Sequence, residues 1–155
     1  MAVQKNINIQ NKKARFEFEI LDKFVAGIQL TGTEIKSIRL SQARITESFC
    51  EFNDRGELFI VNMYIQEYLF GHHFNHKPKS ERRLLLNKRE LRSLKKDVEA
   101  KGNTIVPLRL FINDRGFAKL EIALAKGKQT HDKREVLKER DSKRDLARIK
   151  KNFNT

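Results

Sequence analysis

The chain has 155 residues, of which 39% are hydrophobic and eleven are Phe, enough for one compact domain with a single core. Its 33 Lys and Arg against 20 Asp and Glu give a formal net charge of +13, which indicates a polyanionic partner such as nucleic acid or an anionic membrane face. The sequence contains no apolar run of membrane-spanning length, no secretory signal and only one cysteine, Cys50, so we expect a cytoplasmic protein without an intrachain disulfide and with Cys50 in its core.

The first predicted elements are strands. Apolar and polar positions roughly alternate over residues 15–21 and again over 26–30, which is the period of a half-buried strand, and Gly27 suggests a bend or bulge. The segment TGTEIKSIRLS follows them. Its apolar spacing predicts a short helix with Thr31 or Thr33 at the N-cap.

The same four-residue turn motif then occurs twice in the rest of the domain. Asn-Asp-Arg-Gly occurs at residues 53–56 and 113–116, each time between alternating runs, and therefore predicts two hairpins. Between them, the apolar residues of NKRELRSLKKDVEAKG recur at helical spacing. We expect one amphipathic helix there, ended by Gly102.

About six or more short strands with about three accompanying helices predict a mainly β fold. The pattern favours a closed barrel of the oligonucleotide-binding (OB) type and leaves an SH3-like barrel or an open α+β sheet as alternatives. We expect residues 1–125 to form this domain and residues 126–155 to form a basic C-terminal tail.

The tail contains eleven Lys or Arg and five Asp or Glu, and its apolar residues are few. Side-chain pairs at helical spacing permit a helix, but each contributes only about 0.2–0.5 kcal/mol. We therefore expect the tail to be largely disordered in isolation and to become ordered on a polyanion, where counterion release offsets the lost conformational entropy. A plain solvated tail is the alternative.

Motifs of enzymes are scarce. No phosphate-binding loop and no nucleophile elbow occurs. His72, His73 and His76 lie within five residues, but no second ligand group stands at a usual spacing, so we expect no metal and no cofactor. Basic residues gather instead in three clusters that would suit a phosphate backbone: Lys12, Lys13 and Arg15; Lys36 and Arg39; Lys77, Lys79, Arg82 and Arg83.

Four segments taken together resemble the bacterial SmpB family, the SsrA-binding proteins, across nearly the whole chain. They are NKKARFEFEILDKFVAGIQLTGTEIKSIR, RRLLLNKREL, GNTIVPLRLF and EIALAKGKQTHDKR. The resemblance implies an OB-like barrel, not an enzyme, that binds the tRNA-like end of tmRNA. It also implies a monomer acting in trans-translation with the 70S ribosome, its small-subunit decoding centre, and elongation factor Tu carried with aminoacylated tmRNA.

The family's motifs carry over onto two sets of residues. The tmRNA contacts that the resemblance implies are Asn11, Lys12, Lys13, Glu34, Lys36, Ser37, Arg39, Arg82, Arg83, Leu85, Lys126, Gly127 and Lys128. The contacts that it implies for the tail, which becomes helical in the empty message channel of the ribosome, are His131, Asp132, Lys133, Arg134, Arg140, Lys143, Arg144, Arg148, Ile149 and Lys150. Gly127 is expected to let the chain bend between the two parts.

This chain departs from the family's pattern at two places. Val25 stands where many relatives carry an acid, and the segment around Ser80 has lost one Arg and gained an acid, so no contact is carried over at either place. Two other functions remain as alternatives from the residues alone. One is an RNA-binding barrel of another kind, such as a ribosomal or assembly protein, and the other is a metal-dependent nuclease that uses the three histidines.

Overall fold

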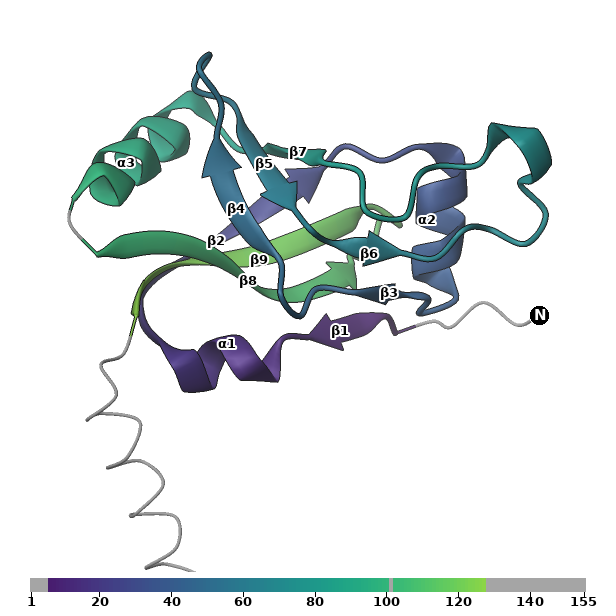
Figure 1. Cartoon of the computed structure of the whole chain (residues 1–155), viewed down its shortest axis with the longest axis horizontal. Helices are drawn as coiled ribbons and strands as arrows, with labels where there is room; N and C mark the ends of the chain where they lie inside the picture. The colour runs from purple at the N-terminus through teal and green to yellow at the C-terminus, as the bar shows by residue number, and fades with distance from the viewer. Residues whose placement is uncertain (1–5, 101, 128–155) are drawn as a thin grey trace, which may run out of the picture.

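The computed structural model describes residues 6–100 and 102–127 (Figure 1). Its strands are β1 (Asn8–Gln10), β2 (Phe18–Ile28), β3 (Ala43–Arg44), β4 (Phe49–Phe52), β5 (Leu58–Val61), β6 (Tyr64–Ile65), β7 (Arg82–Leu85), β8 (Asn103–Ile112) and β9 (Ala118–Gly127). Its helices are α1 (Lys12–Glu17), α2 (Gly32–Arg39), α3 (Lys88–Glu99) and the short 3-10 helix η1 (His72–Phe74).

Six of these strands close into a ring. They pair in the order β8-β4-β5-β7-β2-β9, and β9 pairs back with β8, always antiparallel. β1 joins β8 from outside the ring, while β3 and β6 form a separate two-stranded sheet beside α2 (Figure 1). The prediction of a mainly β fold with three α-helices is therefore confirmed.

Both predicted hairpins are present, and one side chain explains each. In the β4–β5 turn and in the β8–β9 turn, the Oδ1 atoms of Asn53 and Asn113 accept hydrogen bonds from the backbone N–H groups two and four residues later, at 2.9–3.1 Å. Gly56 and Gly116 follow with φ values of 77° and 85°, which a residue with a Cβ rarely adopts. The repeated turn motif thus fixes two connections of the ring.

The first strand prediction is wrong at its start. Residues 15–17 belong to α1, and β2 then runs without a break from Phe18 to Ile28. The expected bend at Gly27 is also absent, since Gly27 pairs regularly with Leu85 and Lys119, and the irregular pairing falls between Ile20 and Asp22. Of the residues predicted as strand, 18–21 and 26–28 therefore lie in β2, whereas 29–30 lie beyond its end.

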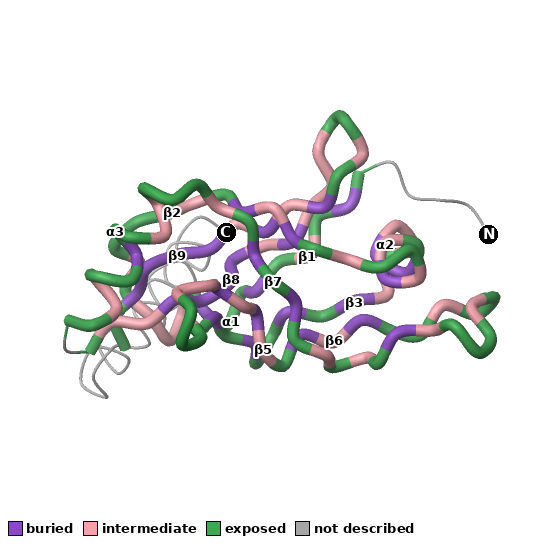
Figure 2. Tube along the Cα trace, turned by 90° about the horizontal axis from the view of Figure 1, so that it is seen from above, coloured by how far each residue is buried: buried purple, intermediate pink, exposed green. Residues whose placement is uncertain are grey.

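The core fills the ring and reaches under the helices. Figure 2 shows buried residues along the ring strands, while the loop that carries η1 between β6 and β7 is exposed or half-buried apart from His76. α3 covers the core with Leu94, which is fully buried, and begins after the N-cap Asn87. Cys50 is buried as expected, and this burial raises the pKa of its thiol. No helix in residues 6–100 or 102–127 is long and apolar enough to cross a membrane.

Candidate nucleic-acid interface

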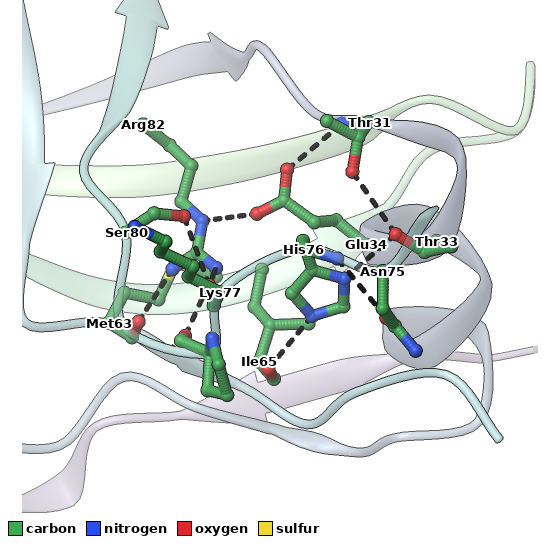
Figure 3. Close-up of polar contacts among 11 residues, drawn as sticks. Thr31, Thr33, Glu34, Met63, Ile65, Asn75, His76, Lys77, Ser80 and Arg82 are labelled. Carbon is green, nitrogen blue, oxygen red and sulfur yellow. Dashed lines mark hydrogen bonds and ion pairs between the residues drawn. The ribbon is translucent and has the colours of Figure 1, made fainter. Parts of the chain in front are cut away.

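A buried ion pair holds α2 against β7 (Figure 3). Glu34 on α2 and Arg82 on β7 are each 3% exposed, and the Arg82 Nε donates to Glu34 Oε2. The other Glu34 oxygen accepts the backbone N–H of the N-cap residue Thr31 at 2.9 Å. The Arg82 Nη atoms donate at 2.6–3.2 Å to the carbonyls of Met63, Lys77 and Pro78. One guanidinium therefore ties together a helix, a strand and the end of a loop.

Four of the thirteen residues that the resemblance implies as tmRNA contacts lie inside the protein: Asn11, Glu34, Ser37 and Arg82. The polar groups of Glu34 and Arg82 are bound within the chain, as are those of Asn11. The Ser37 Oγ is buried without a hydrogen-bond partner in the described part of the chain. Their contact with RNA stays a prediction, and in this structure they position the surface that surrounds them.

Asn11 links the start of the domain to β8. Its Oδ1 accepts the backbone N–H of Ala14 at 3.2 Å, which caps α1, and its Nδ2 donates to the carbonyl of Pro107 at 3.0 Å. We expect Asn11→Ala to lower the free energy of unfolding by about 1–2 kcal/mol, because it removes the cap and a buried hydrogen bond to the Pro107 carbonyl. Urea unfolding measures this, with the exposed neighbour substituted in Lys12→Ala as a control that stays within about 0.5 kcal/mol of the parent.

The three histidines do not form a common site. Both ring nitrogens of His76 have partners, since Nδ1 lies 2.9 Å from Thr33 Oγ1 and Nε2 lies 2.9 Å from the carbonyl of Ile65 (Figure 3). Because a carbonyl only accepts, Nε2 carries the proton and Nδ1 accepts from the hydroxyl in the neutral ring. His72 and His73 are exposed on η1. Within residues 6–100 and 102–127, no group of three His, Cys, Asp or Glu is arranged to hold a metal ion.

A groove lies on the outer face of the sheet, where Leu85, Gly27 and Lys119 stand side by side on β7, β2 and β9. Its volume is about 420 Å³, and α2 and the β8–β9 turn form its other walls. Gly27 keeps it open, because a Cβ at that position would lie 3.3 Å from the Cβ of Leu85. The glycine expected to bend the strand therefore leaves room on its surface.

The groove combines apolar and cationic side chains. Leu85 and Phe117 are 50% and 64% exposed there, and they are accompanied by Arg39, Arg115 and Lys119. Arg39 also lies 3.5 Å from the carbonyl of Gly116, so α2 contacts the β8–β9 turn. The structure thus brings together two of the predicted RNA-binding residues, Arg39 and Leu85.

Sequence reasoning missed Arg115, Phe117 and Lys119 as members of this surface. The available signal was the predicted turn at residues 113–116, which ends beside the exposed Phe117. Its place opposite α2 depends on pairing between β2 and β9, which the sequence does not reveal.

Other predicted residues lie outside the groove. Lys12 and Lys13 are exposed on α1, and a hydrogen bond and ion pair with Glu47 raise the pKa of Lys13. Lys36 on α2 lies 5.4 Å from the ring centre of Tyr68. Arg83 is exposed on β7.

The first two residues of the predicted tail belong to a strand. Lys126 and Gly127 are the last residues of β9 and pair with β2, so the described strand continues two residues past the predicted boundary at 125. The bend expected at Gly127 involves residues beyond the described range and stays a prediction. The remaining predicted contacts fall outside the described residues: Lys128, His131, Asp132, Lys133, Arg134, Arg140, Lys143, Arg144, Arg148, Ile149 and Lys150.

Comparison with known proteins identifies the family. Residues 8–152 match the family described as SmpB protein. An SsrA-binding protein of Flavobacterium psychrophilum is 67% identical over 149 residues, 96% of this chain and 99% of the relative, and one of Bacteroides thetaiotaomicron is 52% identical over 146 residues, 94% and 97% of the two chains. A solved structure described as "tmRNA-SmpB: a journey to the center of the bacterial ribosome" matches with a TM-score of 0.67 and 46% identity, over 80% of this chain and 86% of that one. The resemblance inferred from the sequence is confirmed: the chain belongs to the SmpB family.

Proposed function

We propose that this protein binds the tRNA-like domain of tmRNA (SsrA RNA) and delivers it to ribosomes stalled on messages that lack a stop codon. The tail then occupies the empty message channel at the decoding centre, so that the nascent chain is tagged for degradation and the ribosome is released. This is the function that the names of the relatives and of the solved structure support.

The groove between α2, β7, β2 and the β8–β9 turn is the observation that carries this proposal. Proteins recognise unpaired RNA bases by stacking them on exposed aromatic and apolar side chains, with cations placed for the neighbouring phosphates. Phe117 and Leu85 offer such faces, and Arg39, Arg115 and Lys119 stand around them. A folded tRNA-like end presents both exposed loop bases and a phosphate backbone, which suits this combination.

Further parts of the proposal follow from the family. The closed ring of six strands is an OB-like barrel, and the protein acts as a monomeric adaptor that is not an enzyme and needs no metal or cofactor. It works in the cytoplasm, where it meets the 70S ribosome and elongation factor Tu bound to aminoacylated tmRNA.

A titration against the tRNA-like domain of tmRNA, with ordinary tRNA as competitor, tests the proposal. We expect tight binding that ordinary tRNA does not displace, both for the full chain and for a copy that ends at residue 131. Binding that any tRNA displaces, and that depends on total charge alone, would overturn the proposal and leave an RNA-binding protein of another kind.

The groove itself is tested by Phe117→Ala. We expect the Kd for the tRNA-like domain to rise about tenfold, because stacking of a base on an aromatic side chain contributes about 1–3 kcal/mol. Phe74→Ala is the matched control: Phe74 is 92% exposed on η1 and does not line the groove, so its removal leaves the Kd unchanged. An equal loss of affinity in both variants would show that the RNA does not bind in this groove.

A further inference from the structure

A second hollow lies between α3 and the β4–β5 hairpin. Its volume is about 380 Å³, and its floor is made by the apolar Leu58, Leu84 and Leu91. Its rim carries five cations from three parts of the chain: Arg55 in the hairpin turn, Arg83 on β7, and Lys88, Arg92 and Lys95 on α3. Lys95 reaches toward the hairpin, with its Nζ 4.0 Å from the place that a Cβ on Gly56 would take. We call this hollow the α3 cleft.

One acid lines the α3 cleft, and its charge is already matched. Glu57 Oε2 pairs with Arg83 Nη1 at 3.0 Å, and Glu57 Oε1 accepts a hydrogen bond from Asn53 Nδ2 at 3.0 Å. The hydrogen bond from Asn53, together with the charges of Arg83 and Arg55, lowers the pKa of Glu57, so the pair stays ionised at neutral pH.

The other four cations of the α3 cleft have no acidic partner in the described part of the chain. Within the described ranges, no ion pair is formed by Arg55, Lys88, Arg92 or Lys95. Charges of one sign that converge on a hollow raise the local concentration of the opposite charge. The occupant that fits is an anion with several charges spaced along it.

The α3 cleft adjoins the groove over Gly27. Side chains alternate along β7, so Arg83 and Leu85 both point outward, with Arg82 and Leu84 buried. Arg83 lines the α3 cleft and Leu85 lines the groove. The two hollows thus flank one short strand, and a single chain lying across β7 can enter both.

From this continuity and the unmatched charge, we infer that the α3 cleft binds the phosphodiester backbone of the same RNA molecule whose bases occupy the groove. The inference rests on the proposed function and extends its site. Because phosphates carry no sequence, the cleft adds affinity without adding preference for one RNA over another.

The test compares the full chain with the variant Arg55→Ala/Arg92→Ala/Lys95→Ala in salt-series titrations against the tRNA-like domain of tmRNA. We expect the Kd to rise at least about tenfold at moderate salt and the slope of log K against log salt to become shallower by about 2–3, since each phosphate contact contributes about 0.7–0.9. The affinity for ordinary tRNA is expected to fall by a similar factor, so that the preference remains.

A second triple variant, Lys23→Ala/Arg44→Ala/Lys96→Ala, is the matched control. It removes three exposed cations that line neither hollow and leaves the slope nearly unchanged. Equal effects of both triples, or no effect of the first, would overturn the inference. So would loss of binding to ribosomes with tmRNA binding intact, because the occupant would then be ribosomal RNA.

The same titrations separate this inference from the proposed function. If the parent protein shows no preference for the tRNA-like domain over tRNA, the proposed function fails. If the preference is present and the triple variant of the α3 cleft binds as the parent does, only the inference about the cleft fails.

Discussion

Replacing Asp132, Lys133 and Arg134 together by alanine is expected to abolish tagging of nascent chains on stalled ribosomes and to leave binding of tmRNA nearly intact. These residues lie outside the part of the chain that the structure describes, in the tail of eleven basic and five acidic residues. The substitution removes one acid and two bases, so the net charge falls by one unit from +13. A change that small alters long-range attraction to RNA very little.

The expected loss of tagging has a different cause. A segment with few apolar residues orders only when it binds, and the groups that contact the partner decide whether ordering occurs. If the tail takes the place of the missing codon in the message channel, removing three adjacent charged contacts removes the signal that the ribosome reads. Translation in vitro of a message without a stop codon, with tmRNA supplied, measures the fraction of tagged product.

The matched control is Glu135→Ala/Lys138→Ala/Lys151→Ala. It removes the same number of acids and bases from the same tail but none of the residues implied as ribosome contacts. We expect it to tag nearly as well as the parent. Equal loss of tagging in both triples would mean that the charge of the tail matters and its motif does not, and loss of tmRNA binding in the first would place the tail in the RNA-binding surface.

The sequence predicted those elements whose determinants are local. Each hairpin follows from one Asn and one Gly three residues apart, and α2 begins after Thr31, one of the two expected caps. α3 follows from its apolar spacing and begins after Asn87. In these segments the residues that fix the backbone are neighbours in sequence, so the pattern alone is informative.

What the sequence did not predict depends on distant partners. The pattern predicts strand over residues 15–17, the last half of α1, because Phe16 and Phe18 alternate with polar residues, yet the cap of α1, Asn11, donates to Pro107 of β8. Strands of two or three residues, such as β1, β3 and β6, are too short to show a period. The β2–β9 pairing that builds the groove also joins residues about a hundred positions apart.

The candidate site shows the same limit. The family's motifs supplied Arg39 and Leu85, which the structure brings to one groove, but nothing local indicated that Phe117 joins them. Likewise, a charged Glu and a charged Arg 48 residues apart suggest two surface contacts until the fold places them against each other. Sequence reasoning identifies charged residues readily, whereas their burial is decided by the whole chain.

Arg82→Met is expected to lower the free energy of unfolding by about 3–5 kcal/mol, because it leaves the Glu34 carboxylate buried without its partner. The carbonyls of Met63, Lys77 and Pro78 also lose one hydrogen bond each, although Ser80 still donates to Lys77 and Ile65 to Pro78. Urea unfolding measures the loss. Its matched control is Arg83→Met at the next residue, where the pair with Glu57 is partly exposed and contributes about 0.2–1 kcal/mol.

The double variant Glu34→Gln/Arg82→Met decides what the pair does for RNA binding. It keeps the net charge and the approximate side-chain volumes. It also replaces the unpaired Glu34 carboxylate of Arg82→Met by an amide whose oxygen still accepts the Thr31 N–H. We expect it to recover much of the stability lost in Arg82→Met, since replacing a buried pair whole costs far less than breaking it.

If the pair only positions α2 and β7, the double variant also recovers binding to the tRNA-like domain, because Arg39 and Leu85 return to their places across the groove. If Glu34 or Arg82 contacts the RNA itself, stability returns and binding does not. Unfolding and titration of the same samples therefore compare how much stability and how much RNA affinity the double variant recovers. Recovery of both means that Glu34 and Arg82 only position their neighbours, whereas recovery of stability alone means that at least one of them contacts the RNA, as the family's motifs imply.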